Sequence, residues 1–165
     1  MADADPALEA PKYIYKIAAS HPKPSWPPQD KVDSAKAVLP ASDLDSKSRF
    51  IHMSTAKQIP GTLKHFFRTS SRDRNSVFLL KVLWPPVFDD LGLLRWESPD
   101  AKICGPREDE GLFPHLYFFD GEEPMDGSNR LWLRKAEVED VKELVSEEGT
   151  EGWEQSLQDL EKWLV

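Results

Sequence analysis

Apolar and polar positions alternate along the chain in short blocks, and most of these blocks predict strands. Residues 13–17 combine aromatic and β-branched side chains, which pack well on a pleated surface. Residues 77–83 are almost continuously apolar, as in a buried strand. Similar shorter blocks predict strands at 50–53, 93–97, 115–119 and 131–133. We therefore expect a β-sheet at the core of the protein.

A helix is predicted directly after the strand at 50–53. Thr55 is followed three positions later by Gln58, which fits the capping box, where both side chains bond the first free N–H groups of a helix. Apolar residues then recur at i, i+4, i+7 and i+8, which predicts a helix to about residue 68. Its expected buried face is Ile59, Leu63, Phe66 and Phe67, and Pro60–Gly61 is expected to kink or split it.

Other segments are predicted to be irregular. Residues 1–11 are small, acidic and flanked by prolines, which indicates a disordered leader. Four prolines around Trp26, within residues 20–29, exclude a helix or a central strand. Residues 31–48 have no clear period, and we expect only one helical turn there, at 34–39. Residues 98–111 are expected to form a loop, because they are rich in proline, glycine and charge.

The C-terminal segment 137–165 is predicted to form two amphipathic helices. In the second helix a shared apolar face would anchor the segment: Trp153, Leu157, Leu160, Trp163 and Leu164. The net charge of −8 also lies here, since the segment holds ten acidic and two basic residues and the rest of the chain is neutral. The expected organisation is a leader (1–11), a single α+β domain (12–136) and an acidic helical extension packed on it (137–165).

Composition excludes several classes of protein. Net acidity argues against nucleic acid as a partner, which would require clustered basic residues. The single cysteine, Cys104, excludes an internal disulfide and a CxxC zinc site. No run approaches the roughly 20 apolar residues that span a bilayer, and the acidic N-terminus lacks the basic flank of a targeting peptide. We therefore expect a soluble cytoplasmic protein with no membrane partner.

Three polar residues in otherwise apolar strands are the candidate catalytic residues: His52, Glu97 and His115. Burying such groups costs free energy unless a partner or a ligand compensates. A purely structural role is the alternative for each of them, including an ion pair between Arg95 and Glu97, which strand alternation places on one face. The histidines show no HxH or HExxH spacing, so no metal is expected, and there is no phosphate-binding glycine loop or GxSxG elbow.

Four blocks, in this order, resemble the domain-of-unknown-function family numbered 952: YIYKI at 13–17, FIHMSTAKQIPGTL at 50–63, LRWE at 94–97 and FPHLY at 113–117. The resemblance covers roughly residues 12–125. That family is similar at superfamily level to the ADP-ribosyltransferase-like fold, a compact split sheet that holds NAD in a cleft. The resemblance thus implies an α+β fold with a mixed or antiparallel split sheet and a few flanking helices.

The resemblance also implies roles for individual residues. Lys16 stands where a first-strand polar residue holds a ribose of NAD, and His52 stands where the nicotinamide pocket is lined. Glu97 matches a late-strand carboxylate that bonds the nicotinamide ribose, beside His115, where an anion would stabilise the oxocarbenium character of glycosidic cleavage. The implied ligand-binding residues are Tyr15, Lys16, Ser54, Thr55 and Tyr117.

Three functional classes stay open on these grounds. The leading hypothesis is a small intracellular protein that binds NAD or a related nucleotide and transfers or cleaves ADP-ribose. The first alternative is an isomerase, cyclase or hydrolase that uses His52, Glu97 and His115 for acid/base chemistry on another small molecule, without NAD, since a fold does not fix a function. The second alternative is a non-enzymatic interaction module that uses Trp26 and the acidic C-terminal segment.

Overall fold

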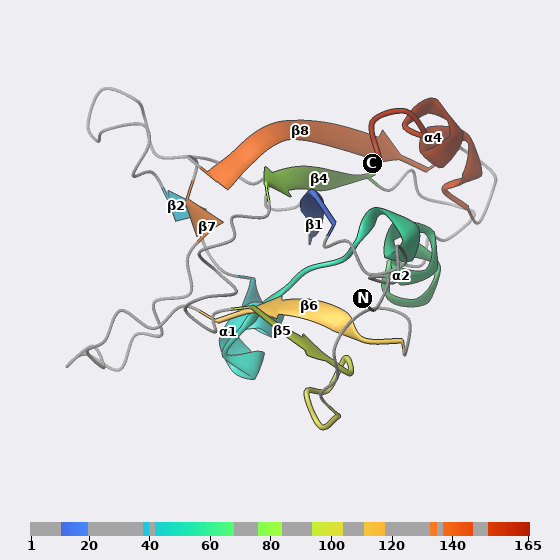
Figure 1. Ribbon diagram of the computed structural model, residues 1–165. Coiled ribbons are helices and arrows are strands. Elements are labelled where there is room, and N and C mark those ends of the chain that lie inside the picture. The colour runs from blue at the N-terminus through green and yellow to red at the C-terminus, as the bar shows by residue number, and fades with distance from the viewer. Residues whose placement is uncertain are drawn as a thin grey trace, which may run out of the picture.

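Two three-stranded antiparallel sheets form the framework of the protein (Figure 1). The computed structural model describes residues 11–19, 38–39, 42–67, 76–83, 94–103, 111–117, 133–134, 137–146 and 152–165. The first sheet has the order β1–β4–β8, with β1 at Tyr13–Ala19, β4 at Ser76–Leu83 and β8 at Val138–Val145. The second has the order β3–β6–β5, with β3 at Ile51–His52, β6 at Phe113–Leu116 and β5 at Leu94–Glu97.

A pair of backbone hydrogen bonds joins the two sheets. Tyr15 N donates to Ser54 O at 2.7 Å, and Ser54 N donates to Tyr15 O at 2.9 Å. The middle of β1 thus forms an antiparallel bridge with the residue that follows β3 by two positions. A further short pair consists of β2 (Val38–Leu39) and β7 (Leu133–Arg134). The predicted α+β class with antiparallel sheets and few helices is confirmed.

The apolar core has two parts, one on each side of β1 and β4. Between the sheets, Ile14 and Leu80 of the first sheet pack with Ile51 and Leu116 of the second. On the opposite face of the first sheet lies a second cluster, made by alternate strand residues and the helices: Tyr15, Leu79, Leu144, Ile59, Leu63 and Trp153. Alternation along β1 and β4 therefore supplies both parts of the core.

The predicted helix after β3 is present and shorter than expected. It begins as a 3₁₀ turn, η3 (Ala56–Gln58), and continues as α2 (Ile59–Phe66). The capping box is confirmed, since Thr55 N donates to Gln58 Oε1 at 3.0 Å. Pro60 lies in the first turn of α2, where no helical partner exists for its missing N–H, so it starts the helix instead of kinking it.

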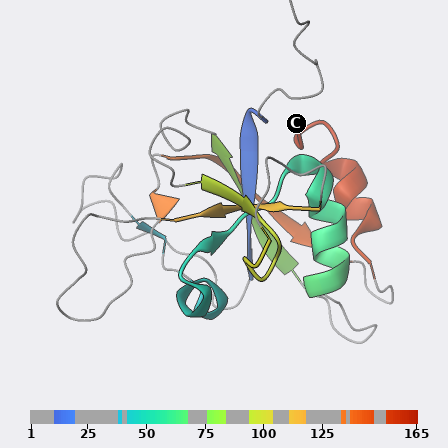
Figure 2. The ribbon, with the colours of Figure 1, turned by 60° about the horizontal axis from the view of Figure 1, so that its bottom comes forward.

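The buried face of α2 is confirmed at Ile59 and Leu63 and wrong at Phe66, which is 63% exposed. The helix ends at Phe66, and Phe67 leaves the helical backbone and packs on the second cluster instead. The helices α2 and α4 (Glu154–Asp159) lie side by side beside the sheets (Figure 2). They share this cluster, which contains Ile59 and Leu63 of α2 and against which Leu157 of α4 packs.

The expectation of an irregular segment at 31–48 is wrong at its C-terminal end. Residues Asp43–Ser48 form a helix, α1, which Ser42 and Asp45 cap reciprocally. Asp45 N donates to Ser42 Oγ at 3.1 Å, and Ser42 N donates to Asp45 Oδ2 at 3.3 Å. A helical turn over 34–39 is wrong at Val38–Leu39, which pairs as a strand, and 34–37 lie outside the described residues.

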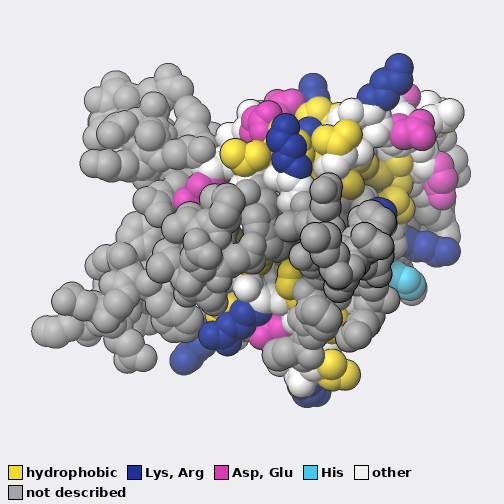
Figure 3. All heavy atoms as spheres, viewed as in Figure 1, with side chains coloured by type: hydrophobic (Ala, Val, Ile, Leu, Met, Phe, Trp, Pro, Cys, Tyr) yellow, Lys and Arg dark blue, Asp and Glu magenta, His cyan; other side chains and the backbone are white. Residues whose placement is uncertain are grey.

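The first of the two C-terminal helices is also a correction, because residues 138–145 form strand β8. The β-branched residues Val138, Val141 and Val145 suit a strand, and β4 would otherwise leave backbone groups unpaired at its edge. Leu144 is buried in the second cluster and the acidic residues of β8 face solvent, as the magenta atoms along the top of Figure 3 show. Residues 138–145 are thus part of the sheet, and among the described residues of 137–165 the second predicted helix is present as α4.

Several predictions lie outside the described residues: the leader up to residue 10, the proline loop with Trp26, Cys104, and strand residues 118–119 and 131–132. In the described part of the chain, no helix is long and apolar enough to cross a membrane.

Candidate functional site

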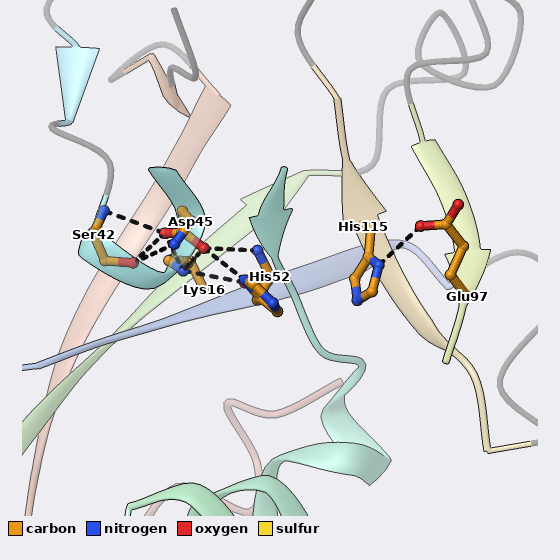
Figure 4. A network of polar contacts seen from close by, with 6 residues as sticks. All are labelled: Lys16, Ser42, Asp45, His52, Glu97 and His115. Atoms are coloured by element: carbon orange, nitrogen blue, oxygen red, sulfur yellow. Dashed lines mark hydrogen bonds and ion pairs between the residues drawn. The ribbon is translucent and has the colours of Figure 1, made fainter. Parts of the chain in front are cut away.

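Two carboxylate–imidazole pairs lie on one face of the second sheet (Figure 4). In the strand register His52 of β3 stands opposite His115 of β6, and His115 stands opposite Arg95 of β5. Residues directly opposite on neighbouring strands share a face, so these three side chains form a row across the sheet. Their neighbours along the sequence, Ile51 and Leu116, face the core.

The first pair is Asp45 with His52, and Lys16 completes it. His52 Nδ1 lies 2.9 Å from Asp45 Oδ1, which also accepts the His52 backbone N–H at 3.0 Å. Lys16 Nζ lies 2.9 Å and 2.7 Å from the two carboxylate oxygens and donates to His52 O at 3.3 Å. Ser42 Oγ donates to Asp45 Oδ2 at 2.7 Å. The short helix α1 thus places a carboxylate, only 1% exposed, between β1 and β3.

The electrostatics of this pair follow from burial and hydrogen bonding. Burial raises the pKa of Asp45, but the hydrogen bonds from His52 and the charge of Lys16 outweigh it and hold the pKa well below its usual range. Burial lowers the pKa of Lys16, while Asp45 opposes that change. Asp45 is therefore a permanent anion at neutral pH.

The second pair is Glu97 with His115. His115 Nδ1 lies 3.0 Å from Glu97 Oε2, and the Tyr117 hydroxyl donates to the same oxygen at 2.6 Å. The side chains of His115 and Glu97 are 1% and 4% exposed. Burial lowers the pKa of His115, with Glu97 opposing and the nearby His52 reinforcing the change. Glu97 has His115 and Tyr117 as partners, whereas Arg95 is exposed with its guanidinium 4.6 Å from the Tyr117 ring centroid.

Phe50 connects the two pairs. Its ring stacks on His115 at 4.0 Å between centroids, with an interplanar angle of 18°, and lies 4.5 Å from His52 and 5.3 Å from Tyr117. The two imidazole rings are themselves 5.3 Å apart. The His52 side chain is 24% exposed, so its ring is accessible to solvent, whereas His115 is buried under the ring of Phe50.

The three predicted catalytic residues therefore come together, and Lys16 and Tyr117 join them. The other predicted ligand-binding residues face α2 and the C-terminus instead. The Tyr15 hydroxyl donates to Val165 O at 3.0 Å, and Ser54 Oγ lies 3.4 Å from Thr62 Oγ1. Thr55 is buried at the start of η3.

Sequence reasoning missed Asp45 and Phe50. Asp45 lies in a segment without hydrophobic period, and the signal that could have found it is the Ser42-x-x-Asp45 spacing of a capping box. Phe50 was predicted as a strand residue with no part in the site. Among the described residues, no group of three or more potential ligands is placed to hold a metal ion.

A hollow of about 250 Å³ lies elsewhere, between α2 and the start of β6. It is lined mainly by apolar surface, and two of its polar side chains, Gln58 and Thr62, are hydrogen-bonded. Gln58 Nε2 donates to Leu112 O, and Thr62 Oγ1 donates to Gln58 O at 2.9 Å. The candidate catalytic residues do not line it.

Comparison with known proteins gives a family and a fold. A family model described as a protein of unknown function, DUF952, matches residues 23–126. Protein CC0527 from Caulobacter crescentus, solved by X-ray crystallography, has a similar fold with a TM-score of 0.51 and 23% identity, over 88% of this chain and 98% of that one. A double mutant of the same protein gives the same values. No curated protein matches.

Proposed function

The chain belongs to the DUF952 family of proteins of unknown function, and we propose that it is an enzyme whose His52 transfers protons on a small metabolite. The contact between Asp45 and His52 carries the proposal. Acid/base catalysts need an imidazole that is held in one orientation and reaches the substrate. His52 meets both requirements, because Asp45 fixes its Nδ1 side and the ring is partly exposed.

The ionisation of Asp45 decides which nitrogen of His52 reacts. An ionised carboxylate only accepts hydrogen bonds, so the Nδ1 atom that contacts it must carry a proton. In the neutral ring Nε2 is then the basic nitrogen. Asp45 also stabilises the imidazolium that forms when Nε2 takes a proton, as the carboxylate does in hydrolytic triads. Asp45 is thus a positioning residue and His52 the catalytic one.

The second pair gives His52 a suitable neighbour. Because burial lowers the pKa of His115, this ring is neutral at pH 7 and places no positive charge beside His52, 5.3 Å away. Glu97 orients His115 through its contact with Nδ1, and the Tyr117 hydroxyl in turn orients Glu97 by donating to the same carboxylate oxygen. The pair thus supports a reaction in which His52 alternates between its neutral and protonated forms.

Cleavage of NAD is the second candidate, and one observation favours it. Four of the residues that resemblance maps to an NAD cleft share one face of the sheet: His52, Glu97, His115 and Tyr117. Two contacts place this candidate second: Lys16, expected to hold a ribose, is committed to Asp45, and Glu97 is bonded to His115 and Tyr117. An interaction module gains no support from Trp153 or Trp163, which pack on the second core cluster.

A substrate-independent assay tests the proposal. The protein is incubated with a metabolite extract in D₂O enriched in H₂¹⁸O, and mass spectrometry detects compounds that gain deuterium or ¹⁸O or change their mass. We expect at least one compound to react, and His52→Gln to slow its conversion by about a hundredfold or more. His65→Gln is the matched control, because His65 is exposed on α2.

Three outcomes decide between the candidates. Equal conversion by wild type and His52→Gln would refute acid/base catalysis by His52, as would an extract that the wild type leaves unchanged. Release of nicotinamide from added NAD that is lost in Glu97→Gln and kept in His52→Gln would support the NAD candidate instead. If instead the conversion of a metabolite is lost in His52→Gln and no nicotinamide is released, proton transfer without NAD is supported.

A further inference from the structure

Arg95 is an exposed cation on the same face of the sheet as His52. Its guanidinium lies 4.6 Å from the Tyr117 ring centroid, a cation–π contact that holds the group while leaving its N–H donors available. Within the described part of the chain, Arg95 has this ring as its neighbour and no hydrogen-bonding or ion-pair partner. A guanidinium in this state is equipped to bind an oxyanion with two parallel hydrogen bonds.

The strand register relates Arg95 to the proposed base. Arg95 and His52 both stand opposite His115, one on each side of it, so their Cα atoms are about 10 Å apart, twice the spacing of neighbouring strands. The rings of Tyr117 and Phe50 connect them, since Phe50 lies 5.3 Å from Tyr117 and 4.5 Å from His52. A small metabolite can span this distance.

The other charges of the site are already balanced or bonded. Lys16 neutralises Asp45 at 2.7 Å, and Glu97 accepts from the Tyr117 hydroxyl and contacts His115. Both carboxylates are buried, whereas Arg95 is exposed. Arg95 therefore presents an exposed positive charge on this face.

We infer that the substrate of this site carries an oxyanion, a carboxylate or a phosphate, which Arg95 binds while the reacting atom lies at His52 Nε2. The inference rests on the proposed function and adds the substrate class to it. Arg95 sets the orientation of the molecule through a bidentate contact, and Tyr117 keeps the guanidinium in place. A neutral metabolite would lack this second point of attachment.

Titration of the histidine ring signals by NMR tests the inference. Sodium phosphate and sodium succinate are the probes, at constant pH and with chloride added to keep the ionic strength constant. We expect saturable shifts of the His52 ring signals, assigned with His52→Gln. Arg95→Gln should weaken binding by about tenfold or more, because charge-assisted hydrogen bonds are lost. Arg95→Lys should bind the anion more weakly than the wild type and more tightly than Arg95→Gln, since lysine keeps the positive charge but cannot form two parallel hydrogen bonds.

Lys102→Gln is the matched control, because Lys102 is 79% exposed in the turn after β5 and should leave anion binding unchanged. Saturation by only one probe would assign the anion as phosphate or as carboxylate. The inference is overturned if neither anion shifts His52 saturably, or if Arg95→Gln binds as tightly as the wild type. If the inference fails in this way but the conversion of a metabolite still depends on His52, the proposed function holds and the substrate is neutral. If conversion does not depend on His52, the proposed function falls whatever the anions do.

Discussion

Replacing Asp45 with asparagine should destabilise the protein strongly, because it removes the anion from a buried polar cluster. Asparagine keeps the shape of the side chain and one acceptor oxygen. Its NH₂ group would however meet groups that are themselves donors, since Lys16, His52 and Ser42 all supply hydrogens to Asp45. Lys16, whose side chain is 10% exposed, would also lose the counter-charge of its ammonium.

The magnitude follows from the burial of both partners. Lys16 and Asp45 are 2.7 Å apart, with side chains 10% and 1% exposed, so solvent screens their interaction weakly. Breaking a buried pair by removing one partner typically costs about 3–5 kcal/mol, mostly because the other charge stays buried alone. Against a total stability of about 5–15 kcal/mol for a domain, Asp45→Asn should still fold, with a much lower urea midpoint.

Urea unfolding followed by tryptophan fluorescence measures the effect, with three further variants. Asp43→Asn is the matched control, since Asp43 is exposed on the same helix and should change stability by at most about 0.5 kcal/mol. Lys16→Met removes the other charge, and the double variant with Asp45→Asn should be about 1–3 kcal/mol more stable than the sum of the two single effects predicts. A loss below about 1 kcal/mol for Asp45→Asn, or additive effects in the double variant, would contradict the reasoning.

Two further predictions concern pH and packing. Burial lowers the pKa of His115 from its usual 6.5, so below that pH the unfolded state binds more protons and the urea midpoint should fall between pH 7 and pH 5. His115→Gln should flatten this fall and His65→Gln should leave it unchanged; equal slopes in all three proteins would be the contrary result. Leu63→Ala should cost about 2–5 kcal/mol and Phe66→Ala less than about 0.5 kcal/mol, since Leu63 is fully buried and Phe66 is 63% exposed. Equal losses in urea unfolding would mean that Phe66 packs in solution.

Local patterns predicted those elements whose signal lies in neighbouring residues. Strand β1 follows from its aromatic and β-branched residues, β4 follows from its nearly continuous apolar run, and the start of η3 follows from Thr55 and Gln58. The pattern failed at β8, because Val138, Val141 and Val145 are spaced i, i+3 and i+7, which also fits a helix. Pairing with β4 decided the outcome there, and strand preference depends on such tertiary context.

In the candidate site, too, some residues could be predicted from local sequence and others could not. His52, Glu97 and His115 could be found from the sequence, because polar residues in apolar strands need a partner or a ligand. The Ser42-x-x-Asp45 spacing could mark Asp45 as a helix cap, but nothing in the sequence pairs it with Lys16, 29 positions away, or with His52. Only the folded chain brings α1 against β1 and β3.

The contacts of Lys16 and Arg95 reverse the roles that the sequence suggested for these two residues. Resemblance assigned ligand binding to Lys16, yet Lys16 pairs with Asp45 and helps to keep it ionised, and in the proposed function that ionisation fixes the reactive nitrogen of His52. Arg95 entered only as a rival partner of Glu97, yet it is an exposed cation on the face that His52 shares. Asp45 contacts His52 and Glu97 contacts His115, so the groups that we propose for a substrate are His52 Nε2 and the Arg95 guanidinium. Those two groups, about 10 Å apart in Cα positions, suit a small anionic molecule that exchanges a proton at one end.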